Sequence, residues 1–159
     1  RIRVMENPVY TDTFRELGAN AIPMAWTEAL TAMQQGTIDG QENPVNVIHS
    51  FNLDETQNYM TLSRHTYAPA IFVMGMPVWN QLPEQAQEVL LTAAQEAAEH
   101  ERQVNAEMES EQLQALRDAG MEINDNPDME AFQSAVAPVY EKYGEQFGDY
   151  LPRIQEALK

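Results

Sequence analysis

A long segment between Pro83 and Gly120 contains neither proline nor glycine and has helical spacing. Pro83 suits a first helical turn, and Gly120 suits the residue after a helix end. The apolar residues that recur between them are Ala86, Val89, Leu90, Ala93, Ala97, Val104, Met108 and Leu116. A helix over 84–119 is about 50 Å long, which exceeds the width of one small domain. Because the apolar spacing drifts and alanine dominates, we interpret it as a bridge between two lobes and not as a coiled coil.

Short strands alternate with helices in the first third of the chain. The expected strands cover 2–5, 21–24 and 38–42, and the expected helices cover 9–17, 27–35 and 45–50. Gly18 and Gly36 follow two of the helices, where a left-handed residue ends a helix well. This alternation predicts an α/β fold with a mostly parallel sheet and flanking helices.

After residue 58 the sequence no longer alternates short strands with helices and instead contains apolar, β-rich segments. We expect strands at 59–62 and 67–74, the second long enough to pass through the middle of a sheet. A short edge strand is expected at 121–123, and helical pieces are expected over 128–158.

The composition excludes several classes of function. The net charge of −16 and the scattered basic residues disfavour nucleic-acid binding. The chain has no cysteine, which excludes disulfides, thiolate metal sites and thiol nucleophiles. No apolar run approaches the roughly 18 residues of a membrane span, so we expect no direct membrane insertion.

Signals for catalysis are weak throughout the sequence. The three histidines, His49, His65 and His100, have no metal-ligand spacing. No Gly-rich phosphate loop and no nucleophile elbow is present. The carboxylates Glu28, Asp39 and Glu42 lie near predicted element ends, where a general base can sit, but an isolated acid there is more often structural. We therefore predict no catalytic residue, no cofactor and no metal site.

The junctions where strands end and helices begin carry a more persuasive set of side chains. Ligands of open α/β sheets collect at such junctions. Arg3, Trp26 and Asn43 lie at three of them and together offer a guanidinium, an apolar wall and an amide. These groups suit a small carboxylate. The alternative is structural: Arg3 in a surface salt bridge, Trp26 in the core and Asn43 as a helix cap.

The same junctions carry a resemblance to the solute-binding subunits of tripartite ATP-independent periplasmic (TRAP) transporters, the DctP family. The matching text is IRVMENPVY (2–10), FRELGANAIPMAWTE (14–28), AMQQGTIDGQENP (32–44), ETQNY (55–59), His65 and WNQLPEQAQEVLLTAA (79–94). DGQENP after a helix containing alanine, glutamine and glycine is highly specific. The resemblance covers essentially the whole chain in one register.

The resemblance implies a periplasmic-binding-protein-like fold that closes around an organic acid. Arg3 matches the arginine that forms a salt bridge with the ligand carboxylate, and Asn43 matches the asparagine that assists it. Trp26 lies at the position where the family has an aromatic residue, commonly phenylalanine, as a wall of the ligand pocket. The implied location is the periplasm, and the implied partners are a small organic acid and the permease subunits of an ion-gradient-driven transporter.

The resemblance also implies that this chain is the carboxyl-terminal part of a longer protein whose first lobe is absent. We divide it into a ligand-binding lobe (1–62), a crossing strand and connection towards the first lobe (63–83), the bridging helix (84–119), and a final strand with helices packing on the lobes (120–159). Without the first lobe, we expect exposed apolar surface and self-association.

Three alternative functions remain open from the sequence. The same anchor suits a sugar acid or a compatible solute such as ectoine. A loaded protein can also be presented to a sensor instead of a transporter. An enzyme using Asp39 or Glu42 as a base is the least favoured, because the resemblance is to binding proteins.

Overall fold

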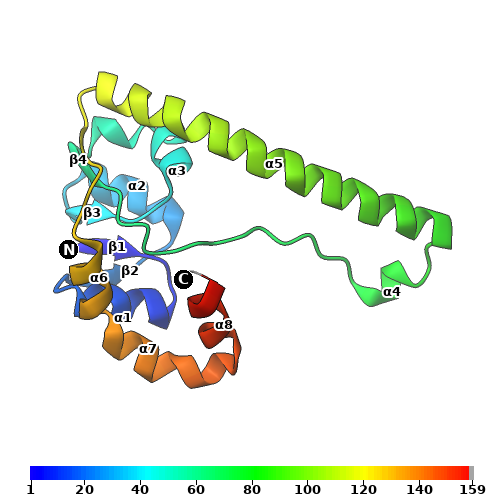
Figure 1. The fold of residues 1–159 in the computed structure, drawn as a ribbon. Helices are drawn as coiled ribbons and strands as arrows, with labels where there is room; N and C mark the ends of the chain where they lie inside the picture. Colours follow the sequence, from blue (N-terminus) through cyan, green and yellow to red (C-terminus); the bar gives the residue numbers. More distant parts are fainter. Residues whose placement is uncertain (158–159) are drawn as a thin grey trace.

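A three-stranded parallel sheet lies at the start of the chain. The computed structural model describes residues 1–157, and its first sheet has the order β2-β1-β3, with β1 over Ile2–Val4, β2 over Ala21–Pro23 and β3 over Gly40–Gln41 (Figure 1). The central strand β1 places Arg3 between Ile22 and Gln41. The predicted α/β class and parallel pairing are confirmed.

The helices that follow these strands lie within one residue of the predicted ranges. They are α1 (Pro8–Glu16), α2 (Trp26–Gln34) and α3 (Val45–Ser50). The Asn7 side chain accepts a hydrogen bond from the Val9 amide at 2.8 Å, which caps α1. Gly18 (φ +83°) and Gly36 (φ +66°) follow α1 and α2 in the left-handed conformation, which favours glycine.

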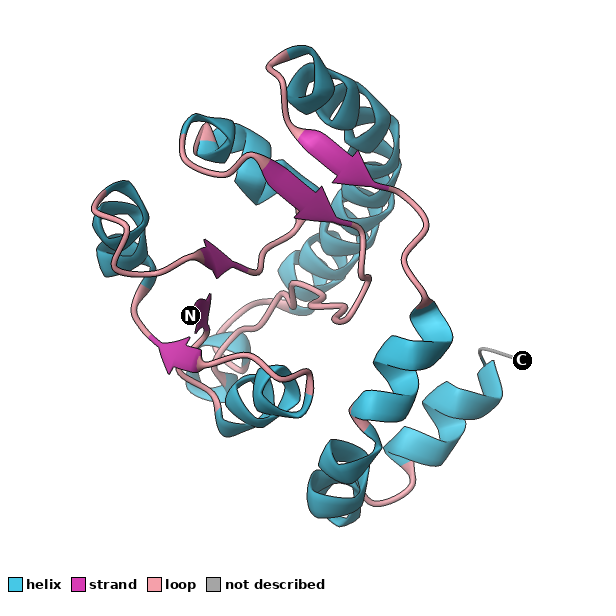
Figure 2. Ribbon diagram, turned by 90° about the vertical axis from the view of Figure 1, so that its left-hand side faces the viewer, coloured by secondary structure: helices cyan, strands magenta, loops and turns pink. Residues whose placement is uncertain are grey.

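A second, two-stranded sheet joins segments far apart in sequence. β4 (Tyr59–Thr61) pairs in parallel with β5 (Glu122–Asn124), and these strands lie side by side with the long helix behind them in Figure 2. Both strands were expected at these places. They form a sheet of their own instead of extending the first one, and the short helical turn η1 (Leu53–Glu55) precedes β4.

The long helix α5 covers Glu84–Asp118, as the sequence predicts to within one residue. Its carboxyl-terminal end packs on α3, and its buried residues, Gln112 and Leu116, both lie at that end. The rest of α5 projects away from the sheets together with α4 (Met76–Trp79), as Figure 1 shows. None of the helices within residues 1–157 is long and apolar enough to cross a membrane.

The core gathers under α2, α3 and the packed end of α5. Its buried cluster consists of Ala32, Met33, Ile38, Ile48, Leu53, Leu116 and Met121. Leu116 is 1% exposed, so this single side chain from the long helix is sealed among residues of the first third. The core therefore ties α5 to the lobe that carries the sheet.

The strand expected over Tyr67–Met74 is absent from the described structure. The segment between β4 and α4 is an extended loop that runs alongside α5 towards its far end (Figure 1). Phe72 and Val73 are exposed to 71% and 87% of their surface. A strand needs a partner for its backbone groups, and no other strand of residues 1–157 reaches this segment. The aromatic and β-branched pattern therefore did not predict the conformation of this segment within residues 1–157.

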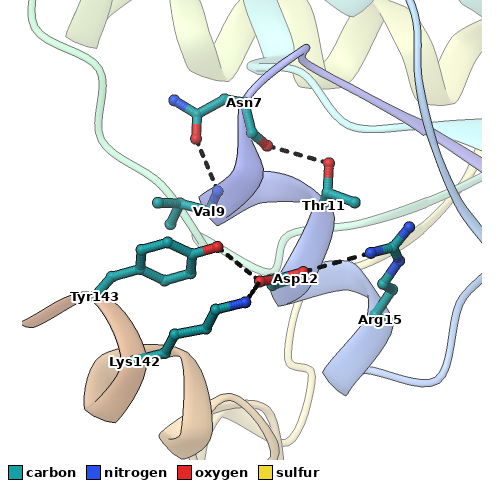
Figure 3. A network of polar contacts seen from close by, with 7 residues as sticks. All are labelled: Asn7, Val9, Thr11, Asp12, Arg15, Lys142 and Tyr143. Atoms are coloured by element: carbon teal, nitrogen blue, oxygen red, sulfur yellow. Dashed lines mark hydrogen bonds and ion pairs between the residues drawn. The ribbon is translucent and has the colours of Figure 1, made fainter.

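The carboxyl-terminal helices pack back on the first third of the chain. They are α6 (Met129–Ala135), α7 (Ala137–Tyr143), the short turn η2 (Gly144–Phe147) and α8 (Tyr150–Ala157). Helical pieces were expected over 128–158, of which residue 158 lies outside the described residues. α7 packs against α1, and Asp12 accepts hydrogen bonds from Lys142 Nζ at 2.6 Å and the Tyr143 hydroxyl at 2.7 Å (Figure 3).

Candidate functional site

Arg3 occupies the middle of the first sheet. The residue is 5% exposed, and its Nε donates a hydrogen bond to the Met24 carbonyl oxygen at 2.9 Å. That carbonyl lies just after β2, so the end of one strand orients the side chain of its neighbour. Within residues 1–157 Arg3 forms no salt bridge, which contradicts the alternative that it belongs to a surface ion pair.

The charge on Arg3 has no carboxylate within ion-pair distance among residues 1–157. Burial lowers the pKa of the Arg3 guanidinium, while the carboxylates of Glu42 and Glu6 act in the opposite direction. The group nevertheless remains charged at neutral pH, because an arginine side chain in a protein is not deprotonated there. A buried cation without an ion-pair partner is costly, and a ligand carboxylate held in two-pronged geometry supplies that partner.

Trp26 is the first residue of α2 and lies beside Arg3. The centre of its ring is 5.4 Å from Arg3 Cζ, within the range of a cation–π contact. Its other neighbour is Phe51, whose ring centre lies 5.2 Å away at an interplanar angle of 83°. The indole is half-buried and also packs on the core cluster. Trp26 therefore contributes to the core and at the same time contacts the candidate anchor.

Asn43 reaches the same region through Gln41. Asn43 Nδ2 donates a hydrogen bond to Gln41 Oε1 at 2.6 Å, and Gln41 is the register partner of Arg3. Asn43 is not the cap of α3, because Pro44 occupies that position without a side-chain hydrogen bond. Among the described residues no hydrogen bond joins Asn43 directly to Arg3. The structure thus brings Arg3 and Trp26 into contact and links Asn43 to them by way of Gln41.

Glu42 pairs with His65 and also lies close enough to Arg3 to act on the pKa of its guanidinium. It is 7% exposed, and its Oε2 lies 3.2 Å from His65 Nε2, while His65 Nδ1 lies 2.8 Å from Ser63 Oγ. The second oxygen, Oε1, is buried and has no hydrogen-bond partner within residues 1–157. Glu42 is therefore a buried carboxylate paired with the half-buried imidazole of His65.

Asp39 and Glu28 have structural surroundings. Asp39 accepts hydrogen bonds from the side chain of Arg1, and these hold the pKa of its carboxyl well below the usual range. A carboxylate with such a low pKa is a poor proton acceptor. Glu28 lies in the first turn of α2, where a negative charge complements the helix dipole. Neither residue supports the enzyme interpretation.

Two shallow grooves occur elsewhere on the described surface. One, of about 430 Å³, lies near the start of α1, and its lining residues are Glu6, Asn7, Pro8, Thr11, Asp12, Arg15, Pro23, Lys142 and Tyr143. The basic groups there are already paired with Asp12, as Figure 3 shows. The other, of about 530 Å³, lies at the far end of α5 between Pro83 and Leu90. Neither groove is lined by Arg3, Trp26 or Asn43, which together make up the candidate face.

Sequence reasoning missed two residues of this face, Gln41 and Phe51. Gln41 was recognisable in principle, because strands 2–5 and 38–42 were both predicted and only their register was missing. Phe51 ends α3, and no local pattern indicates that its ring meets Trp26.

Comparison with known proteins gives a consistent result across sequence and structure. Residues 1–146 match the family described as "Bacterial extracellular solute-binding protein, family 7" (DctP). A solute-binding protein of Verminephrobacter eiseniae is 40% identical over 148 residues, which is 93% of this chain and 44% of that relative.

Solved structures show the same similarity. A TRAP periplasmic solute-binding protein from Polaromonas sp. JS666, bound to D-erythronate, has a TM-score of 0.86 at 38% identity and covers 93% of this chain and 49% of its own. Another, from Pseudomonas putida F1 with bound D-glucuronate, has a TM-score of 0.89 at 34% identity, with coverages of 97% and 50%. The chain spans about half the length of these relatives, and the expected periplasmic-binding-protein-like fold is confirmed.

Proposed function

This chain belongs to the DctP family of bacterial extracellular solute-binding proteins, and from that premise we infer that it supplies about half of a carboxylate-binding cleft. The observation that carries the proposal is Arg3, a buried guanidinium with no ion-pair partner in the described chain and an indole beside it. A ligand carboxylate completes its coordination, and the face contains no arrangement for bond cleavage.

The ligand that best fits this face is a sugar acid. D-erythronate and D-glucuronate, bound by the two structural relatives, each combine one carboxylate with several hydroxyl groups. Arg3 suits the carboxylate, and the linked amides of Gln41 and Asn43 suit hydroxyl groups, because an amide both donates and accepts hydrogen bonds. The sequence left the sugar acid open as an alternative to other organic acids, and the comparisons favour it.

The remaining half of the protein completes the cleft in this proposal. The division into 1–62, 63–83, 84–119 and 120–159 assigns the first segment to ligand binding and the second and third to contact with the other lobe. The extended loop and the far part of α5 support it, because both expose apolar side chains such as Phe72, Val73 and Val89. The loaded protein then delivers its ligand in the periplasm to a membrane permease, and an ion gradient drives transport by that permease.

A ligand screen on the full-length protein tests this proposal. We expect D-glucuronate or D-erythronate, at a hundredfold excess over Kd, to stabilise the protein by about 2.7 kcal/mol. That corresponds to a rise of several degrees in Tm by thermal shift. D-glucose is the matched control, because it retains the hydroxyl groups of D-glucuronate and lacks the carboxylate. Equal stabilisation by D-glucose, or none by any sugar acid, contradicts the proposal.

Trp26 is expected to limit the size of the ligand. Trp26→Ala removes the flat wall beside Arg3, so we expect D-glucuronate binding to weaken by about 1–3 kcal/mol while bulkier acids gain affinity. Calorimetry with a panel of acids measures the order of preference, and a melting curve measures stability. Phe147→Ala changes an exposed aromatic residue of η2 and should leave the order unchanged. A large fall in Tm for Trp26→Ala with an unchanged order assigns Trp26 to the core alone.

A further inference from the structure

We propose that Phe51 is a positioning residue of the carboxylate site, holding the Trp26 indole against the Arg3 guanidinium. The inference rests on the proposed function and extends the site to the far end of α3. It arises from a continuous row of contacts in which Phe51 meets Trp26, Trp26 meets Arg3, and Arg3 donates to the Met24 carbonyl oxygen.

The first contact in this row restrains the indole. The two aromatic rings meet nearly at right angles with centres 5.2 Å apart, a favourable edge-to-face arrangement. Phe51 is 48% exposed, so its ring is only partly covered and is not needed to fill the core. The core contact of α3 is made by Ile48, which is 5% exposed. The contact with Trp26 is thus the specific interaction of this exposed ring.

The second contact connects the indole to the anchor. With Arg3 Cζ 5.4 Å from its ring centre, Trp26 covers one side of a guanidinium whose Nε is already committed to Met24. A planar fork binds a carboxylate well only when its plane is fixed, because both prongs must be aligned together. A freely turning indole leaves that plane less defined and increases the ordering cost of binding.

Helix α3 gives Phe51 and Asn43 a common support. Asn43 lies two residues before the helix begins at Val45, and Phe51 directly follows its last residue, Ser50. One short helix therefore sets both the amide end and the aromatic end of the site. Its packing against α5 fixes the helix from the opposite side.

The test follows Arg3 and ligand affinity separately in the full-length protein. Isotope labelling of arginine allows the Arg3 Nε–H resonance to be observed by NMR, with its assignment made by its loss in Arg3→Lys. Trp26→Leu gives the resonance position without the indole ring current. We expect Phe51→Ala and Phe51→Leu to move the ligand-free resonance towards that position. Phe51→Tyr should restore it.

The second readout is affinity for D-glucuronate by calorimetry. We expect a loss of roughly three- to tenfold in Phe51→Ala, from the usual strength of an aromatic pair, and near-parental affinity in Phe51→Tyr. Phe147→Ala is the matched control, because Phe147 is 51% exposed and lies in η2, and both readouts should stay at the parental values.

Each outcome separates the inference from the proposed function. An Arg3 resonance that stays at the parental position in Phe51→Ala overturns the positioning role. A resonance that moves while D-glucuronate affinity remains parental overturns the role of that positioning in binding. If the parental protein does not bind D-glucuronate, the sugar-acid proposal fails for this probe, while the ligand-free resonance still decides whether Phe51 positions Trp26 against Arg3.

Discussion

Replacing Arg3 by alanine in the full-length protein is expected to weaken D-glucuronate binding at least about a hundredfold, equivalent to about 2.7 kcal/mol. The loss is large because the ligand carboxylate enters a largely buried site and then finds no cation there. Isothermal calorimetry on the purified variant measures the effect directly. The strong burial of Arg3 and its missing ion-pair partner within residues 1–157 make it the residue on which the proposal depends most.

Two further variants make the Arg3 experiment specific. Arg3→Lys keeps the positive charge but not the fork, so it too should bind poorly. Arg153→Ala removes an exposed arginine of α8 that pairs with Asp149, the residue before that helix, and parental affinity is expected. A melting curve for each variant separates lost binding from lost folding. Near-parental affinity in a well-folded Arg3→Ala protein removes the central claim.

The isolated 159-residue chain is expected to dimerise or aggregate. Its extended loop exposes apolar side chains, including Ile71 at 76%, Phe72 at 71% and Val73 at 87%. Exposed apolar surface and backbone without strand partners favour association between copies. Sedimentation velocity over a concentration series should therefore show species heavier than the 18.0 kDa monomer.

A polar version of the loop provides the control for association. Replacing Ile71, Phe72 and Val73 together by serine removes apolar surface without touching the core, so this variant should shift towards the monomer. An unsubstituted chain that remains a monomer at all concentrations contradicts the assignment of the loop and α5 as surfaces for another lobe. Association that persists unchanged in the triple variant places the contact elsewhere on the molecule.

Elements set by local signals were predictable from the sequence. The helix over Glu84–Asp118 was expected because its apolar spacing is a local signal and because Pro83 and Gly120 mark its two ends. The strand–helix alternation around Gly18 and Gly36 was predictable for the same reason. Tyr67–Met74 was wrong as a strand inside this chain, because pairing depends on a partner and side-chain pattern alone does not provide one. The separation of β4 and β5 into their own sheet was likewise beyond local patterns.

The candidate site divides in a similar way. Arg3, Trp26 and Asn43 were selected because they lie where predicted strands end, and the structure brings the first two into contact. Their roles in binding stay predictions. The hydrogen bond from Asn43 to Gln41 is local, but the place of Gln41 beside Arg3 follows from strand register. The Phe51 contact follows from how α3 packs, which no local pattern indicates.

The attachment of α5 at one end makes it a lever arm. From the contact around Leu116 to Glu84 the helix measures about 48 Å, so a tilt of roughly 10° at the attached end displaces the far end by about 8 Å. A small shift of the core side chains beside α3 thus produces a displacement near α4 that is larger than the diameter of a water molecule. Whatever body rests on the far end of α5 moves in proportion to repacking around Leu116.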